Sequence, residues 1–559
     1  MKHYIDFTPA KCRDCYLCLK SCPVKAIKLV EHQARIIPDR CIQCGNCTRV
    51  CPQEAKTVHS DMDDIRALFS SGKQLVASVA PSFVSSFGLT NFLQMEKALK
   101  DLGFAFAEET AVGAVAVTEE YARLLRSGNY KNLISSACPS ITRMIQIYYP
   151  HALKYLAPVA SPMVAHSKML RDRFPEATIV FIGPCISKKR EASESGQIDQ
   201  VITFEELQLL MAENNISFPE PEDAPFLMAG ASARRYPTGS GIIKSFRNRP
   251  RNYEYLAVDN IQRCAEILKN VDTYDHMFLE MNSCEFGCIN GPCSLCSKDV
   301  SMLSEVNVRK YASSAQEAGI PPYDEAGLTR KLKKIFDGSM TPSEQEMKAI
   351  MAKTGKFTAS DELNCGACGY NTCREKAWAV FNGYADEELC IPYMRSKAES
   401  VSSEVMRRMP FGIIVLSSSF NIESINKAAM HILGIDAFHP EGQQLFDFVS
   451  IPDFVIAQST ETNILNKRTE IEKTGKVVEL SVILLKEHGS LLGIIKDVTE
   501  ENSYNEKLRA VRQETYRVTD EVVKKQMRIA QEIASLLGET TAETKVALLK
   551  LKNLMQDEE

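Results

Sequence analysis

The chain has 559 residues, of which 45% are hydrophobic and 25% charged, and its formal net charge is −5. These values are typical of a globular protein with several domains, and the mixed charges exclude a strongly basic surface for nucleic acid or an anionic membrane. Because no apolar stretch could span a bilayer and the N-terminus has no apolar signal region, we expect a cytoplasmic protein. In that reducing compartment, 19 cysteines indicate metal binding and not disulfides.

Residues 1–60 contain two cysteine runs of identical spacing, C-x2-C-x2-C-x3-C-P. This is the spacing of bacterial two-cluster ferredoxins, in which the fourth cysteine of each run ligates the other cluster. One 4Fe-4S cube would then take Cys12, Cys15, Cys18 and Cys51, and the other would take Cys41, Cys44, Cys47 and Cys22. A structural zinc module is the alternative, but zinc ligands usually come as two separated pairs. We expect this segment to carry electrons.

Residues 61–345 alternate short apolar runs with helical stretches such as 91–102 and 119–126, which predicts parallel sheets covered by helices. Three of the apolar runs lead into four cysteines: Cys138, Cys185, Cys284 and Cys288. Ligands gather at the carboxyl ends of parallel strands, and four thiolates there could hold a 4Fe-4S cube. The alternative is four ordinary buried cysteines. Lys188 and Glu191 argue against it, because buried charges at a strand end imply an anionic ligand.

These three segments resemble the active-site loops of iron-only (FeFe) hydrogenases, whose patterns are Thr-Ser-Cys-Cys-Pro, Pro-Cys-x-x-Lys-x-x-Glu and Glu-x-Met-x-Cys-x-x-x-Cys. The resemblance implies two α/β half-domains around an H-cluster, which is a 4Fe-4S cube joined to a two-iron unit carrying CO, cyanide and a dithiolate bridge. It makes the four cysteines the cube ligands, with Cys288 bridging to the two-iron unit. The candidate cofactor contacts are Lys188, which would donate to one cyanide, and, around the remaining ligands, Ala80, Pro81, Ser82 and Asn282.

The sequence departs from the family pattern where protons move. Ala137 replaces the cysteine that passes protons to the bridging amine, and Arg123 stands where a relay carboxylate is expected after Glu120. Gly183 and Asn282 replace two methionines of the pattern. Proton delivery contributes about a hundred- to ten-thousand-fold in rate. We therefore expect slow turnover, as in the sensory-type hydrogenases.

Glu285 is the expected surrogate proton donor, with Glu280, water or the region of Cys293 as other routes. The candidate catalytic residues are thus Lys188, Glu191, Ala137, Glu120 and Glu285. His166, in a helix after Pro162, is interpreted as structural. The remaining cysteines of this segment are interpreted as core packing, with spare ligands or a redox pair as alternatives for the last two: Cys264, Cys293 and Cys296.

Residues 346–397 hold a further motif, C-x2-C-x4-C-x16-C, formed by Cys365, Cys368, Cys373 and Cys390. It resembles the small 4Fe-4S domain of corrinoid iron–sulfur proteins, and a zinc knuckle is the alternative. Its glycines would let the backbone wrap closely around the cluster, and the helix 374–383 would return the chain to Cys390. Three 4Fe-4S clusters are therefore expected besides the H-cluster.

Residues 398–500 have no cysteine, and their alternating apolar strands are similar to a PAS sensor domain, with Asp497-Val498-Thr499-Glu500 leading into a signalling helix. No residue specifies haem or flavin, and His431 and His439 are interpreted as non-ligands. In residues 501–559, apolar residues at a/d-like spacing predict a two-stranded coiled coil, with a solvated charged helix as the alternative: Val518, Val522, Ile529, Ile533 and Leu536. A second amphipathic helix is expected to end near Leu554.

The expected fold class is a multidomain α/β and α+β chain of ferredoxin, two-lobed catalytic, small 4Fe-4S, PAS and helical segments. The leading hypothesis is a slow hydrogenase, H2 ⇌ 2 H⁺ + 2 e⁻, that senses H2 or redox state. Its expected partners are H2 and protons, a redox protein such as ferredoxin, a downstream signalling protein and a second copy of the chain, but no nucleic acid and no membrane. Alternatives are a metabolic ferredoxin-linked hydrogenase and a non-catalytic iron–sulfur protein without the two-iron unit, which would tend to lack Lys188.

Overall fold

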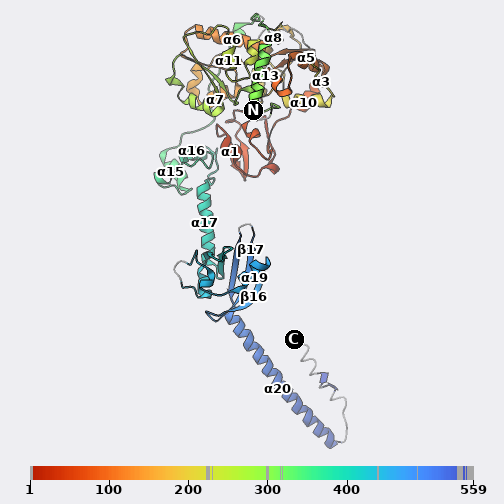
Figure 1. Ribbon diagram of the computed structural model, residues 1–559, viewed down its shortest axis with the longest axis vertical. Coiled ribbons are helices and arrows are strands. Elements are labelled where there is room, and N and C mark those ends of the chain that lie inside the picture. Colours follow the sequence, from red (N-terminus) through yellow and green to blue (C-terminus); the bar gives the residue numbers. More distant parts are fainter. Residues whose placement is uncertain are drawn as a thin grey trace. The chain divides into compact units, whose positions relative to one another are not determined.

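The computed structural model describes residues 4–221, 227–228, 231–296, 301–314, 316–317, 319–436, 440–486, 489–537, 546–547 and 549–550. The chain forms two compact units, an N-terminal unit (Met1–Met394) and a C-terminal unit (Arg395–Glu559), which Figure 1 colours along the sequence. No helix within the described ranges is long and apolar enough to cross a membrane.

The ferredoxin-like segment is built from two short antiparallel strand pairs. β1 (Ile5–Phe7) pairs with β4 (Lys56–Val58), and β2 (Ile27–Val30) pairs with β3 (Gln33–Ile36). Each cysteine run is completed by a short helix, α1 (Leu17–Ser21) or α2 (Asn46–Arg49). Gly45, before α2, has φ +75°, and a Cβ there would lie 2.5 Å from Pro292 of the catalytic segment. Glycine therefore lets these two segments touch.

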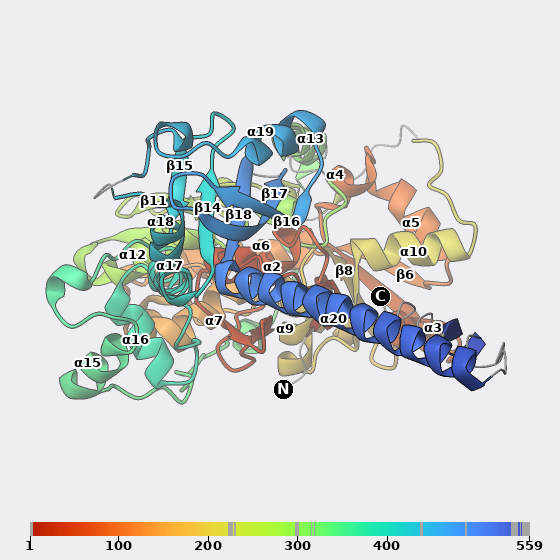
Figure 2. The ribbon, with the colours of Figure 1, turned by 90° about the horizontal axis from the view of Figure 1, so that it is seen from below.

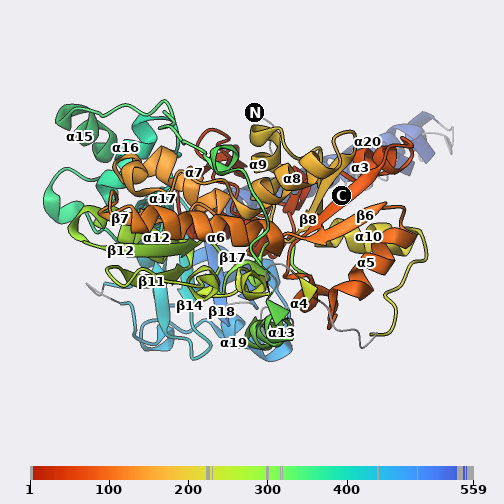
Figure 3. The same cartoon turned by 90° about the horizontal axis from the view of Figure 1, so that it is seen from above.

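The catalytic segment contains two larger parallel sheets, as the sequence predicts, and a two-stranded parallel pair of β10 (Leu227–Met228) and β13 (Gln316–Glu317). The first has the order β6 (Phe106–Glu109), β5 (Leu75–Val79), β8 (Thr178–Gly183) and β9 (Gln200–Thr203). The second has the order β11 (Glu254–Asp259), β12 (Met277–Asn282) and β7 (Asn132–Ile134). Figures 2 and 3 both place β11 on one side of the unit and β6 on the other. The strands β5 and β8 are buried on both faces, which explains their uninterrupted apolar runs.

Helices cover both sheets. The predicted helix at 91–102 is α5 (Phe92–Asp101), which begins at a capping box formed by Asn91 and Gln94. The helix predicted at 119–126 is longer than expected: α6 (Ala111–Arg126) begins eight residues earlier, in a small apolar stretch that has no polar face to reveal it. The other helices here are α3 (Met62–Phe69), α4 (Phe83–Phe87), α7 (Pro139–Tyr148), α8 (Pro162–Arg173), α9 (Ser187–Ser195), α10 (Phe204–Glu213), α11 (Gly241–Ser245), α12 (Ile261–Lys269), α13 (Ser301–Ser313) and α14 (Glu325–Leu328).

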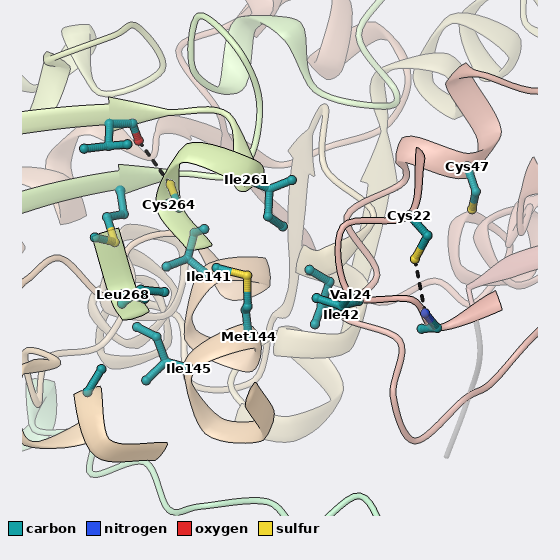
Figure 4. Packing of buried hydrophobic residues seen from close by; sticks show 14 of the residues in the cluster. Cys22, Val24, Ile42, Cys47, Ile141, Met144, Ile145, Ile261, Cys264 and Leu268 are labelled. Atoms are coloured by element: carbon teal, nitrogen blue, oxygen red, sulfur yellow. Dashed lines mark hydrogen bonds between the residues drawn. The ribbon is translucent and has the colours of Figure 1, made fainter. Parts of the chain in front are cut away.

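One apolar core continues from the ferredoxin-like segment into the catalytic segment. Val24 and Ile42 lie in the same cluster as residues of α7 and α12, namely Ile141, Met144, Ile145, Ile261 and Leu268 (Figure 4). Cys264 is fully buried in this core, and its thiol donates to the Val258 carbonyl at 3.4 Å. The continuous core fixes the ferredoxin-like segment against the catalytic segment.

The small iron–sulfur segment contains α15 (Glu344–Ala352) and α16 (Cys373–Phe381), and α17 (Ile391–Arg408) follows it. The helix predicted at 374–383 is α16. This segment touches the ferredoxin-like segment, since the Lys28 ammonium donates to the Gly383 carbonyl at 3.0 Å. At Gly369, a Cβ would lie 2.6 Å from the Leu19 side chain.

The C-terminal unit has a five-stranded antiparallel sheet with the order β15 (Ile422–Ile425), β14 (Gly412–Leu416), β18 (Ser490–Asp497), β17 (Lys476–Leu485) and β16 (Ile464–Ile471). Figure 2 shows these strands beside α18 (Lys427–Leu433) and α19 (Pro452–Thr460). The long helix α20 (Thr499–Leu537) follows the last strand in the chain. The edge strand β16 is mostly exposed and polar, so no apolar alternation predicts it. His439, the side chain of Leu536 and the expected helix end near Leu554 lie outside the described residues.

Asn426 is the polar centre of the C-terminal unit. Its side-chain oxygen accepts from the backbone of Ala429 and Ile413, and its nitrogen donates to the carbonyls of Met406 and Phe411. All four hydrogen bonds measure 2.8–3.0 Å, and the residue is buried.

We expect Asn426→Ala to lower the free energy of unfolding of the C-terminal unit by about 2–3 kcal/mol, because a helix cap is lost and buried backbone groups lose their partners. Urea unfolding of the full chain followed by circular dichroism measures this. Asn502→Ala, which removes one exposed side-chain hydrogen bond, serves as the control and should change stability little. Equal unfolding curves for the two variants would contradict the role given to Asn426.

Candidate iron–sulfur and active-site cavity

The strand ends of the two parallel sheets meet at one buried cavity of about 100 Å³. The loops after β7, β8 and β12 bring to its wall the four cysteines that the sequence singles out, Cys138, Cys185, Cys284 and Cys288. The loop after β5 contributes Ala80, Pro81 and Ser82. Residues up to 247 positions apart in the chain, Cys44 and Gly291, thus surround one space.

Local structure explains how each loop presents its cysteine. Cys138 is the N-cap of α7, with Pro139 as the first helical residue. The third loop turns sharply at Phe286 and Gly287, both with positive φ, and a Cβ on Gly287 would meet the Pro237 carbonyl at 2.5 Å. Gly291 approaches the Pro184 carbonyl equally closely, at 2.6 Å for an added Cβ. The loops therefore close on one another through backbone contacts.

The four cysteines are half-buried, and three of them have thiols that ionise less readily than usual. Burial and the neighbouring thiols raise the pKa of Cys185, Cys284 and Cys288 above the ordinary value. Buried thiols become thiolates when they coordinate metal, since the metal supplies the compensating charge. The set is therefore suited to an iron cluster.

Lys188 forms the cationic wall of the cavity. Its ammonium donates to Glu191 at 2.7 Å, to the Ser161 hydroxyl at 3.1 Å and to the Ala137 carbonyl at 3.3 Å. The buried Glu191 carboxylate also accepts from Arg330 at 2.7 Å. Burial opposes ionisation of Glu191, but the two cations outweigh it and hold its pKa below the ordinary value. Glu191 thus fixes the position of Lys188.

A buried hydroxyl on the cavity wall gives a test of fit for the H-cluster. Ser82 is fully buried, and its hydroxyl has no hydrogen-bond partner among the described residues. A buried polar group of this kind needs a partner. Four thiols, the Lys188 ammonium and this free hydroxyl fit an anionic group that accepts hydrogen bonds, as the cube and cyanides of an H-cluster would.

The structure does not bring the predicted proton-transfer residues together. Ala137 lines the cavity, but Glu120 is not part of its wall and is paired with Arg123, whose Nε lies 2.9 Å from the carboxylate. Glu285 is exposed and is not part of the wall. Its expected role stays a prediction. Glu280 is buried, and burial raises its pKa to about 8.

Asn282 connects Glu280 to the cavity. It lines the wall, and its amide donates to Asp259 at 3.2 Å and to Glu280 at 3.4 Å. Glu280 itself accepts from the Ile243 backbone at 2.9 Å. The residue that replaces a methionine of the family pattern therefore has polar partners behind it.

A second, smaller cavity in the ferredoxin-like segment is lined by cysteines from both runs, the set predicted to hold one cluster. Its wall contains Cys22 from the first run together with Cys41, Cys44 and Cys47 from the second. Cys44 lines both this cavity and the first one, so the two sites adjoin. No three His, Cys, Asp or Glu side chains in the described part of the chain lie close enough for a single metal ion.

Buried cations flank the second cavity. Arg190 is buried, and its Nε and Nη1 atoms have no hydrogen-bond partner among the described residues, although Nε lies 3.4 Å from Glu194. Burial raises the pKa of Cys41 to about 11, against the opposing effect of Arg190 and Arg143. Guanidinium groups in this position would stabilise a negatively charged cluster.

Eight more cysteines belong to the two remaining predicted ligand sets, one in the ferredoxin-like segment and one in the small iron–sulfur segment. Burial raises the pKa of Cys18, and the nearby thiols of Cys51, Cys12 and Cys15 add to this rise, as the crossed assignment requires. In the small iron–sulfur segment, Cys373 begins α16, Cys390 precedes α17, and Gly366 and Gly369 have φ of +69° and +89°. The Lys356 ammonium lies 3.2 Å from the Cys390 sulfur.

Three segments of the chain match known family models. Residues 73–292 match the model described as iron only hydrogenase large subunit, C-terminal domain. Residues 4–67 match the 4Fe-4S dicluster domain, and residues 361–392 match a model for an Fe-S cluster.

Two curated proteins and one solved structure show the extent of the similarity. Iron hydrogenase 1 of Clostridium pasteurianum is 25% identical over 299 residues, which are 42% of this chain and 52% of that protein. The periplasmic Fe hydrogenase large subunit of Nitratidesulfovibrio vulgaris is 29% identical over 254 residues, 40% of this chain and 60% of that protein. An FeFe-hydrogenase structure from Chlamydomonas reinhardtii aligns with a TM-score of 0.40 and 17% identity, covering 49% of this chain and 99% of that one.

The chain therefore spans between about half and three fifths of the length of the curated relatives it matches. Residues 73–292 are similar to the C-terminal domain of iron-only hydrogenase large subunits, and residues 4–67, which precede them, are similar to 4Fe-4S dicluster domains.

Proposed function

We propose that the chain is an iron-only hydrogenase of low turnover that senses H2 or redox state and signals to a protein partner through its C-terminal unit. The observation that supports this most directly is the cavity itself. Four cysteines from three strand ends share one wall with Lys188 and the free Ser82 hydroxyl, while Ala137 stands where the family pattern has its proton-transferring thiol.

When bound, the H-cluster would supply the iron site for the reaction H2 ⇌ 2 H⁺ + 2 e⁻. The chain's own residues hold and shield it. The four cysteines would be its ligands, Lys188 would donate to an anionic iron ligand, and Ser82 would donate to another. Glu191 and Arg330 keep the ammonium in position.

Low turnover follows from the missing proton groups. Ala137 has no titratable atom, and the Glu120 carboxylate is neutralised by its ion pair with Arg123. A positioned acid or base contributes about a hundred- to ten-thousand-fold to rate. A cavity that binds its ligand but turns over slowly is suited to detection, because the bound state lasts long enough to shift a conformational equilibrium.

The small iron–sulfur segment is positioned to receive the signal. Arg40, beside Cys41, is ion-paired with Asp337 and lies over the rings of Tyr148, Trp378 and Tyr384. Asp337 and Tyr148 belong to the catalytic segment, and Trp378 and Tyr384 belong to the small iron–sulfur segment. A change of charge at the Cys41 cluster would therefore act directly on this contact.

The C-terminal unit supports the resemblance to a PAS domain through its five-stranded antiparallel sheet and its exit, where the Thr499 hydroxyl donates to Asp497 at 2.6 Å before α20. On α20, the four described a/d-like residues are all exposed in the single chain: Val518, Val522, Ile529 and Ile533. An exposed apolar stripe of this kind supports pairing with a second copy. All described cysteines are free thiols, which agrees with the proposed cytoplasmic location.

Infrared spectroscopy of the matured protein tests the H-cluster. We expect CO and cyanide bands in the unaltered protein and at least a tenfold loss of their intensity in Lys188→Met, because a charge-assisted hydrogen bond worth about 1.5–3 kcal/mol is removed. Lys244→Met, at an exposed lysine outside the cavity, is the control. Absence of the bands in the unaltered protein would exclude both the sensory and the metabolic hydrogenase.

Ala137→Cys should raise the H2 oxidation rate by less than about tenfold, because Arg123 still neutralises Glu120 in the outer part of the path. The double variant Ala137→Cys with Arg123→Glu should exceed it, since both proton groups are then present. Film electrochemistry measures both rates, with Arg126→Ala as a surface control. Recovery of rates typical of metabolic hydrogenases by Ala137→Cys alone would favour the metabolic alternative.

Arg40→Met should loosen the small iron–sulfur segment, because Asp337 is left as a buried carboxylate without its cation, at a cost of about 3 kcal/mol. We expect cleavage by a protease within residues 330–345 to become at least tenfold faster. Arg35→Met, at an exposed arginine of the same segment, is the matched control. Unchanged cleavage in Arg40→Met would show that Arg40 does not hold the two segments together.

A further inference from the structure

We infer that a chain of four hydrogen-bonded side chains carries protons between the active-site cavity and the surface: Thr110, Ser78, His166 and Glu108. This inference rests on the proposed function, because the protons are those of the H2 reaction. The residues belong to β5, β6, the loop after β6 and α8. None of them is a position where the family pattern places its proton groups.

The inner end of the chain is Thr110, which directly follows β6. Thr110 is part of the cavity wall, together with Ser82 and Ala137. Its hydroxyl lies 2.8 Å from the hydroxyl of Ser78, a fully buried residue of β5. A proton released in the cavity therefore has a hydroxyl to enter and a second hydroxyl behind it.

The middle of the chain is His166 on α8. The ring is fully buried, and its Nδ1 lies 2.8 Å from the Ser78 hydroxyl. Gly113 on α6 makes this position possible, because a Cβ there would lie 2.6 Å from the His166 backbone nitrogen and from its Cβ. The helices α6 and α8 thus touch through backbone, and the imidazole reaches the edge of the first sheet.

The outer end of the chain is Glu108. Its carboxylate lies 2.8 Å from His166 Nε2, and its side chain is one-fifth exposed. It lines a third cavity, of about 530 Å³, together with Arg173 and Lys168. Burial opposes ionisation of Glu108, but hydrogen bonds from His166 and Arg173 outweigh it and lower its pKa. The carboxylate is therefore ionised, and its oxygen can accept the hydrogen bond of the ring N–H along which a proton would leave.

Each link of this chain can both accept and donate a proton. The hydroxyls of Thr110 and Ser78 have one donor hydrogen and free lone pairs, and the imidazole can take a proton at one nitrogen while it releases another from the opposite nitrogen. One proton enters at Thr110 as one leaves from Glu108, so the net charge of the chain is unchanged. No electron moves along it.

A buried histidine whose two nitrogens are satisfied is usually a structural residue, and the sequence alone supports that interpretation of His166. The two ends of the chain favour transfer instead, because one lies on the wall of the active-site cavity and the other on the wall of a different cavity. All three links measure 2.8 Å, the ordinary length of a hydrogen bond between such groups.

The test uses the matured holoprotein and rapid-mixing infrared spectroscopy. Oxidised protein is mixed with H2, and the rate at which the CO and cyanide bands shift is followed in H2O and in D2O. We expect Thr110→Val, Ser78→Ala and His166→Gln each to slow the shift by about ten- to a hundredfold and to increase the solvent isotope effect, because proton transfer becomes limiting. The final spectrum should match that of the unaltered protein.

His151→Gln is the matched control, because its ring contacts the Leu268 carbonyl at 2.9 Å and has no part in the chain. Thr110→Val keeps the shape of the residue, so it tests the inference even if the histidine variant does not fold. Intact bands that shift at the unaltered rate in Thr110→Val and Ser78→Ala would overturn the relay and leave the proposed function standing. Absence of CO and cyanide bands from the unaltered protein would overturn both.

Discussion

The structure depends on four half-buried thiol groups that share one cavity wall between two parallel sheets. Carboxyl ends of parallel strands are where ligands bind in α/β folds, and here β7 and β12 from one sheet face β8 from the other across one cavity. Buried thiols ionise only against a compensating charge, so the site is completed by metal. The loops that close it approach each other backbone to backbone, at Gly287 and Gly291, where a side chain would not fit.

The buried ion pairs around Lys188 fix the positions of side chains and add little to the stability of the fold. Lys188, Glu191 and Arg330 form a nearly dry network, and the loss of hydration in such networks offsets most of the Coulomb attraction. The gain is a lysine ammonium held at a defined point of the wall. Arg190 follows the same principle at the neighbouring cavity, where its unpaired guanidinium nitrogens lie near Cys41.

In the proposed function, electrons and protons would move through different elements of the chain. Cys44 lines both the active-site cavity and the ferredoxin-like cavity, and Arg40 joins the ferredoxin-like segment to the small iron–sulfur segment. Both Cys44 and Arg40 belong to the ferredoxin-like segment. The hydrogen-bonded chain that ends at Glu108 instead runs through β5, the end of β6 and α8. In the proposed function, separate paths would allow the proton rate to be low without weakening the contact at Arg40.

The sequence alone predicted the cysteine groups, the parallel sheets and part of the cavity wall, because cluster ligands follow short fixed spacings and buried strands are continuous apolar runs. It did not reveal other wall residues such as Thr110. It could not place the polar partners. Whether Glu120 is free or paired, and whether Glu285 reaches the cavity, depends on how loops and helices pack. The partners of His166 lie 88 and 58 residues away, at Ser78 and Glu108, on strands that only the folded sheet brings together. Ligand spacing is local, whereas a hydrogen-bonded relay is assembled across elements, so only the tertiary structure decided it.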